Sequence, residues 1–193
     1  MSGSVSRTRR GLLAGGAAAL AAQALPVRLF AAIPANTPIH GLSAFGDLKY
    51  PADFAHFGYI NPDAPKGGEM RLAPWNWFYN QNTQTFNTLN SFVAKGDSPP
   101  RMELCFDSLM VAALDEPDAI YGLVAETVEI SADRNSYTFR LRPQATWHDG
   151  TALTAHDCAF SFLTLKEKGA PTLQLALTDL KDARALDDHT LVL

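Results

Sequence analysis

The sequence predicts an α/β fold for the chain beyond its first 35 residues, and three observations within residues 123–169 lead to this prediction. Apolar and polar side chains alternate over residues 137–142, as they do in a half-buried strand. The stretch Trp147-His148-Asp149-Gly150 ends in a glycine that permits a tight turn. Thr154 and Asp157 then have the spacing of a helix capping box. A strand, a turn and a helix are therefore expected in succession.

Residues 1–32 predict an export signal that is later removed. Arg9 and Arg10 precede two leucines and a short stretch made almost wholly of Gly, Ala and Leu. Paired arginines before such a segment are typical of twin-arginine export signals, and the segment is shorter than the roughly 20 apolar residues that span a bilayer. An ordinary secretory signal that carries two adjacent arginines is the alternative. We expect cleavage between residues 24 and 35, with Ala22-Gln23-Ala24 as the best site.

Charge and cysteine content narrow the classes of function. The chain has a formal net charge of -4, and no basic run follows its N-terminal segment, which argues against binding to nucleic acid. Because the first cysteine is Cys105, a lipid anchor directly after the apolar stretch is excluded. We therefore expect residues 33–193 to form a free, monomeric protein in the periplasm.

Residues 36–67 predict an irregular, extended arm. Prolines and a Gly-Gly pair interrupt the segment, and aromatic residues recur along it. We expect these aromatic side chains to anchor the arm on a core. The alternation in residues 69–73 then predicts a short strand.

An aromatic loop follows this strand. Two tryptophans, a phenylalanine and a tyrosine fall within residues 75–79, and a run of uncharged polar residues comes next. Aromatic rings supply contact area and amides supply adaptable hydrogen bonds, so this composition suits the wall of a ligand pocket. Packing of the same rings into the core is the alternative.

The next segment, residues 98–114, predicts a helix. Ser98 can cap its N-terminus, and Pro99 suits the first helical position. Apolar residues recur at helical spacing and predict one buried face, made of Met102, Cys105, Phe106, Leu109, Met110 and Ala113. We expect Cys105 and Cys158 to be buried thiols; a disulfide between them is the alternative in an oxidising compartment.

Two antiparallel strands are predicted within residues 123–142, joined by turn residues at 131–136. Tyr137, Phe139 and Leu141 would face one way, while Arg140 and Arg142 would lie on a solvated face rather than form an anion site. After the capped helix, which should stop at Gly169, residues 180–193 predict a strand, a turn and the start of another strand.

These segments together resemble a known family. The run "YTFRLRPQATWHDGTALTAHDCAFSF", preceded by "LVAETVEISADRNS", resembles the extracellular solute-binding proteins of the dipeptide/oligopeptide/nickel class, the capture subunits of ABC importers. The earlier "HGLSAFGDLKYPADFAHFGYINPDAPKGGEMRLA" is similar to the subgroup that handles oligopeptides and microcin C. The resemblance covers nearly all of residues 40–193.

The resemblance implies a periplasmic-binding-protein-like fold with two lobes, of which this chain would hold only part of lobe 1 and its extra subdomain. It implies a peptide ligand, ABC importer permease subunits as partners and export by the twin-arginine machinery. It places His148-Asp149-Gly150 and Asp157 at architectural positions. By analogy with the family, the chain after the first strand reaches the ligand, and the candidate ligand-binding residues are Trp75, Asn76, Trp77 and Phe78.

Two other classes of function remain as alternatives. A secreted hydrolase or metalloenzyme would need a site assembled in three dimensions, since neither a G-x-S-x-G nor an H-E-x-x-H motif occurs. A carrier of nickel complexes or haem from the same family is the other alternative. We expect a binding protein with no catalytic residues, no metal and no cofactor.

Overall fold

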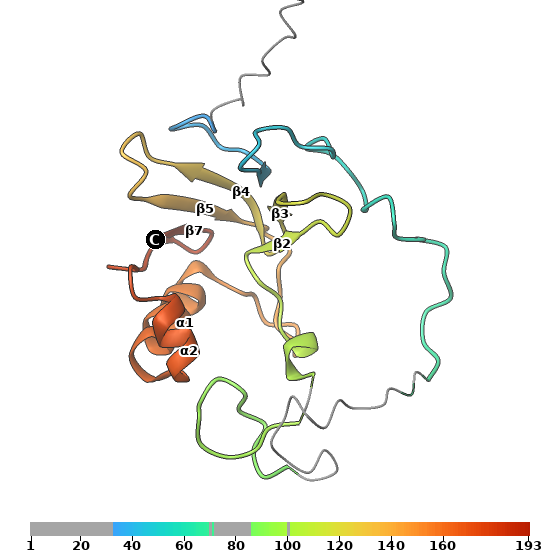
Figure 1. Ribbon diagram of the computed structural model, residues 1–193, viewed down its shortest axis with the longest axis vertical. Helices are drawn as coiled ribbons and strands as arrows, with labels where there is room; N and C mark the ends of the chain where they lie inside the picture. Colours follow the sequence, from blue (N-terminus) through green and yellow to red (C-terminus); the bar gives the residue numbers. More distant parts are fainter. Residues whose placement is uncertain (1–32, 70, 72–85, 100) are drawn as a thin grey trace, which may run out of the picture. The chain divides into compact units, whose positions relative to one another are not determined.

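The structure is a computed structural model that describes residues 33–69, 71, 86–99 and 101–193 (Figure 1). The described elements are a mixture of strands and helices, as an α/β fold requires. They form a four-stranded sheet, a three-stranded sheet and two helices. None of the described helices has the length and apolar character that crossing a membrane requires.

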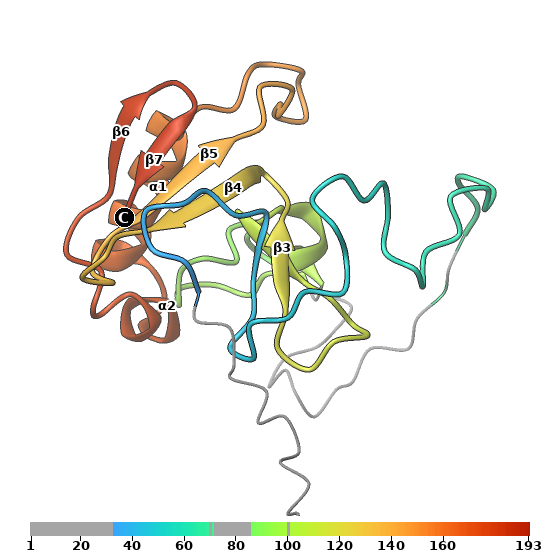
Figure 2. The same cartoon turned by 90° about the horizontal axis from the view of Figure 1, so that it is seen from above.

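The larger sheet is antiparallel throughout. It comprises β4 (Ala125–Ile130), β5 (Tyr137–Leu141), β6 (Arg184–Asp187) and β7 (Thr190–Val192) in the order β4-β5-β7-β6 (Figure 2). The hairpin predicted within residues 123–142 and the two strands predicted near the end of the sequence are confirmed. A β-bulge between Ala125 and Thr127 interrupts the β4–β5 register, and such bulges locally bend a strand and redirect its side chains.

Helix α1 (Ala155–Lys168) packs on this sheet through its small residues. Ala155 and Ala159 join Val128, Phe139 and Leu191 in the main buried cluster. The predicted capping box is present: Asp157 N donates to Thr154 Oγ1 at 3.4 Å, and Thr154 N donates to Asp157 Oδ2 at 2.9 Å. The helix stops at Gly169, as predicted. A short helix that the sequence did not predict, α2 (Pro171–Ala176), follows with its proline in the first turn.

The turn before α1 also has the predicted form. Gly150 has a φ of 85°, a left-handed value that glycine adopts without strain. Asp149 Oδ1 accepts hydrogen bonds from Thr151 N at 2.9 Å and Thr151 Oγ1 at 2.7 Å. The carboxylate therefore closes the turn on its own backbone, which is a structural use of the His148-Asp149 pair.

The smaller sheet connects the arm to the rest of the fold. Its strands are β1 (Gly41–Leu42), β2 (Met110–Ala112) and β3 (Ile120–Gly122), in the order β1-β3-β2. The arm also covers the free edge of β4, where Ile39 N donates to Val128 O at 2.9 Å and Val128 N donates to Ile39 O at 2.8 Å. Beyond β1, the described part of the arm is irregular, as predicted.

The prediction of a helix over residues 98–114 is wrong. Only a short 3-10 helix, η1 (Met102–Cys105), forms there, and β2 follows in an extended conformation. Pairing of β2 with β3 competes with helix formation, and Ser108 Oγ donates to Met110 O at 2.6 Å, which stabilises a non-helical backbone. The predicted buried face is therefore dispersed: Ala113 is buried, Leu109 and Met110 are half-buried, and Phe106 is exposed.

Two further expectations are corrected. Cys105 is exposed rather than buried because it lies on η1 and not on a core-facing helix. Cys158 is half-buried, and burial raises the pKa of its thiol; both cysteines are free. Glu69 and Arg71 are not part of a strand, and most of the strand predicted at 69–73 lies outside the described residues.

We predict that Thr154→Ala lowers the free energy of unfolding by about 1 kcal/mol, since it removes an N-cap. The hydrogen bonds from Thr154 hold the pKa of Asp157 below its ordinary value. A carboxylate with a lowered pKa stabilises the fold above its unfolded pKa, and this contribution is lost as the pH falls through the lowered pKa. The cost of the substitution should therefore be larger at neutral pH than in acid, as measured by denaturant unfolding.

The matched control for this measurement is Thr164→Ala, within the same helix and away from the cap. Alanine is the better helix former, so stability should change by about 0.5 kcal/mol or less. Equal effects of the two substitutions would contradict a specific role for the cap.

Candidate functional site

Three carboxylates on the loop between β2 and β3 hold the arm. Asp118 accepts hydrogen bonds from Ser43 Oγ at 3.1 Å and Phe45 N at 3.3 Å, and also one from Ala44 N. We call this loop, residues 113–119, the acidic loop. A single side chain thus binds two successive backbone amides of the arm, and Phe45 N donates to Ser43 Oγ as well, at 3.1 Å.

The other two carboxylates bind the arm a few residues further on. Lys49 Nζ forms an ion pair with Asp115, and Lys49 N donates to Glu116 Oε1 at 3.0 Å. Tyr50 Oη donates to Asp115 Oδ2 at 2.6 Å. The hydrogen bonds from Lys49 and Tyr50 hold the pKa of Asp115 below its ordinary value. The acidic loop is therefore a receptor for residues 43–50 of the arm.

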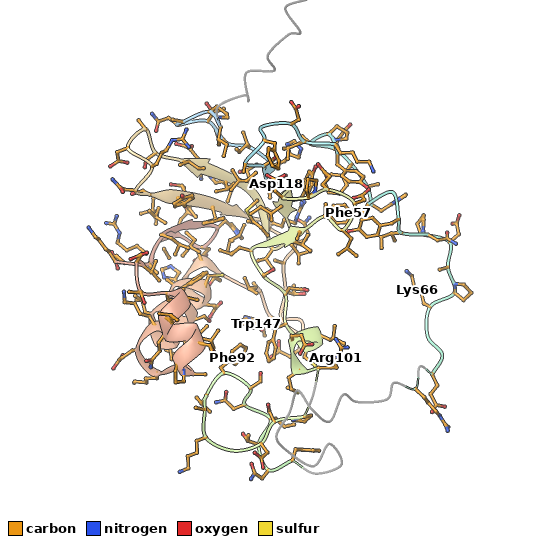
Figure 3. The ribbon with its side chains drawn as sticks, viewed as in Figure 1. Phe57, Lys66, Phe92, Arg101, Asp118 and Trp147 are labelled. Carbon is orange, nitrogen blue, oxygen red and sulfur yellow. The ribbon has the colours of Figure 1, made fainter. Side chains whose placement is uncertain are left out.

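An aromatic cluster lies beside these contacts. Tyr121 is fully buried, and its ring makes edge contacts with those of Tyr50, Phe54 and Phe57 at centroid distances of 5.3–5.7 Å. Tyr121 Oη donates to Glu116 Oε2 at 2.7 Å and accepts from Tyr50 N at 3.2 Å. Burial, together with this bond to Glu116, raises the pKa of Tyr121 to about 12. The expected anchoring of the arm by aromatic side chains is confirmed (Figure 3).

An open cleft of about 630 Å³ lies between the arm and the sheets. The arm lines it with Asp53, Phe54, His56 and Phe57 among other residues, while Glu126, Thr127 and Arg142 are among those that line it from β4 and the end of β5. The expectation of a solvated Arg142 is wrong: the side chain is half-buried, because its Nε donates to Leu123 O at 2.8 Å. Arg140 is exposed, as expected, and donates to Thr190 Oγ1 at 3.0 Å.

A larger apolar groove of about 1000 Å³ borders helix α1. Phe92, Phe106 and Trp147 line it, together with Phe160, whose side chain is 69% exposed (Figure 3). Phe92 and Phe106 contact each other edge to face, at a centroid distance of 4.8 Å. The groove offers apolar contact area and few charged groups.

The structure does not describe the predicted ligand-binding residues. Trp75, Asn76, Trp77 and Phe78 lie outside the described residues. Each His-Asp pair has its own structural role: Asp149 closes a turn, and Asp157 caps α1. His156 is exposed, and its Nε2 lies 3.8 Å from Asp188 Oδ1. Within the described ranges, no three His, Cys, Asp or Glu side chains gather as they would around a metal ion.

Comparison with known proteins finds a family match for the C-terminal part of the described chain. Residues 119–193, from the acidic loop to the end of β7, match the family described as "Bacterial extracellular solute-binding proteins, family 5 Middle". The chain matches the family 5 solute-binding proteins over this segment. The segment contains the capped helix and the four-stranded sheet, and it also contains Glu126 and Arg142 of the cleft.

Longer relatives cover more of the chain. The "Peptidoglycan-binding protein YepA" of Agrobacterium fabrum is 38% identical over 169 residues, which are 81% of this chain and 26% of that protein. The "Probable peptide-binding protein YejA" of the same organism is 42% identical over 127 residues, which are 66% of this chain and 19% of that protein. The chain therefore spans about a quarter or less of the length of these relatives.

Among solved structures, NikZ from Campylobacter jejuni in complex with Ni(L-His) aligns with 46% of this chain and 18% of its own, at 25% sequence identity and a TM-score of 0.40.

We predict that Asp118→Ala releases the start of the arm from the acidic loop. The substitution removes the acceptor of three hydrogen bonds, and a lost bond to a charged group costs about 1.5–3 kcal/mol. Amide hydrogen exchange of Ala44 and Phe45 should accelerate. Asp63→Ala, which removes an exposed carboxylate elsewhere on the arm, is the control and should leave both amides protected. Unchanged exchange in the Asp118 variant would rule out its anchoring role.

Proposed function

We propose that this chain is part of the substrate-binding component of an ABC importer, and that it captures oligopeptides or peptide-like solutes in the periplasm. The match of residues 119–193 to family 5 solute-binding proteins carries the proposal. The names of the two Agrobacterium relatives support a ligand that contains peptide, either a free peptide or the peptide part of peptidoglycan. The partners would be the permease subunits of the importer.

The ligand-binding residues in this proposal are Trp75, Asn76, Trp77 and Phe78. Their composition combines flat apolar rings with an amide, which suits an extended ligand whose side chains vary. Capture would rest on hydrogen bonds to the peptide backbone and on contact with the rings. No bond in the ligand would be made or broken, so the protein would bind without catalysis.

We also propose that residues 1–32 direct export and that residues 33–193 form the N-terminal part of the solute-binding domain. The twin-arginine pattern at Arg9-Arg10 supports this route across the membrane. The mature protein would be free in the periplasm and monomeric.

We predict that short peptides bind the purified protein with measurable heat in isothermal titration. Replacing both Trp75 and Trp77 by Ala should weaken binding by about tenfold or more, since burying one large apolar side chain contributes roughly 1.5–3 kcal/mol. Phe86→Ala removes an exposed aromatic side chain outside the predicted site and should leave the affinity unchanged.

The same titration separates the competing classes of function. Peptides of graded length and peptidoglycan-derived peptides would distinguish the two kinds of ligand, and a repeat after metal chelation would detect a metal-complex carrier. Chemical conversion of any tested peptide would contradict the binding role and favour a secreted hydrolase. Absence of peptide binding by the unmodified protein would contradict the proposal as a whole.

We predict that Arg9→Lys combined with Arg10→Lys leaves the precursor in the cytoplasm, because recognition by the twin-arginine machinery depends on the arginine pair. Arg7→Lys, which leaves the pair intact, should be exported normally. Cell fractionation followed by immunoblotting measures the outcome. Normal export of the double variant would favour the ordinary secretory route.

A further inference from the structure

Two backbone carbonyls hold the guanidinium of Arg142, and the described residues give it no counter-charge. Its Nε donates to Leu123 O at 2.8 Å and its Nη2 lies 3.5 Å from Gly122 O. Within the described part of the chain, no carboxylate forms an ion pair with it, and its Nη1 has no hydrogen-bond partner. A half-buried cation held rigidly in this way is well prepared to bind a carboxylate from outside.

A carboxylate of opposite charge lines the same cleft. Glu126 follows Ala125 at the bulge in β4, and Arg142 follows the end of the neighbouring strand β5, with its backbone N donating to Val124 O at 2.9 Å. The Glu126 side chain is exposed and forms no ion pair with Arg142. The cleft thus presents the positive Arg142 just after β5 and the negative Glu126 on the neighbouring β4, and Asp53 of the arm is a second carboxylate that lines it.

The arm supplies apolar side chains to the lining of the same cleft. Phe54 and Phe57 line the cleft and are half-buried, with ring centroids 5.1 Å apart. Both rings contact Tyr121, so the wall is anchored in the aromatic cluster. The cleft volume of about 630 Å³ lies within the range of small-molecule sites, roughly 300–1,000 Å³.

We propose that this cleft binds a small zwitterion, such as a free amino acid or dipeptide with an aromatic or aliphatic side chain. The ligand carboxylate binds Arg142, its ammonium group binds Glu126, and its side chain packs on Phe54 and Phe57. This proposal does not depend on the one for peptide capture, because it assigns no role to Trp75, Asn76, Trp77 or Phe78.

The test is isothermal titration of the full chain with L-phenylalanine, L-phenylalaninamide and N-acetyl-L-phenylalanine. The amide lacks the carboxylate and the acetyl compound lacks the ammonium group. Each should bind the unmodified protein about tenfold more weakly than phenylalanine or worse, since each loses a charge-assisted hydrogen bond. Equal affinity for all three compounds, or no binding of phenylalanine, would overturn the proposal.

Single substitutions test which charged group of the ligand binds Arg142 and which binds Glu126. In Arg142→Gln, phenylalanine and its amide should bind equally weakly, because the partner of the carboxylate is gone. In Glu126→Gln, phenylalanine and the acetyl compound should bind equally weakly. Arg140→Gln removes a positive charge from β5, two residues before Arg142 and outside the cleft, and should leave all three affinities unchanged. Equal losses in the Arg140 and Arg142 variants would show a non-specific charge effect and reject the site.

Two additional measurements keep the result interpretable. Arg142 also supports two backbone carbonyls, so thermal unfolding of its variant must be compared with that of the unmodified protein. If that variant is unfolded, the comparison of the three compounds on unmodified protein still decides. The Trp75 and Trp77 double variant should bind phenylalanine normally, so failure of peptide capture and failure of this cleft are distinguishable.

Discussion

Burial of the Tyr121 ring is the interaction on which the arrangement of the arm depends. Tyr121 is the middle residue of β3, the strand that pairs with both β1 and β2. Its ring contacts three aromatic residues of the arm, and its hydroxyl bonds to both Glu116 and the backbone of Tyr50. Placing one side chain therefore positions the smaller sheet, the acidic loop and the wall of the cleft together.

Hydrogen bonds from side chains take the place of secondary structure in the arm. Backbone amides that are buried or packed must find acceptors, and helices and sheets usually provide them. For the amides of Ala44, Phe45, Lys49 and Tyr50, the acceptors include Asp118, Glu116 and the Tyr121 hydroxyl. This explains how a segment rich in Pro and Gly is ordered while remaining irregular, and why the loop that receives it is acidic.

The sequence predicts those parts of the fold whose determinants are close together in the chain. Thr154 and Asp157 form their capping box within one helical turn, and the alternation in residues 137–141 marks Phe139 and Leu141 as buried, although Tyr137 at the start of the strand is exposed. The helix prediction for residues 98–114 is wrong because the apolar spacing fits a helix, whereas pairing of β2 with β3 decides the conformation. That pairing is a tertiary effect that outweighs local propensity.

The contacts that form the site are harder to predict from the sequence, because they also join residues that lie far apart in the chain. Asp118 lies more than seventy residues from the amides that it binds, and no local pattern marks that partnership. Arg142 continues the alternation of Arg140, which predicted a solvated side chain, but β5 ends at Leu141 and the guanidinium turns to the carbonyls of Gly122 and Leu123. An anchored arginine is recognisable only when those carbonyls are seen beside it.

The two walls of the cleft differ in their relation to the family. Glu126, Thr127 and Arg142 belong to the segment that matches family 5 solute-binding proteins, whereas Phe54 and Phe57 belong to the arm, outside that match. A protein that shares only the matched segment would keep the charged wall but lack the aromatic one. The arm therefore decides whether these charges face open solvent or a cleft with an apolar side, and the acidic loop, by binding the arm, decides whether the arm stays there.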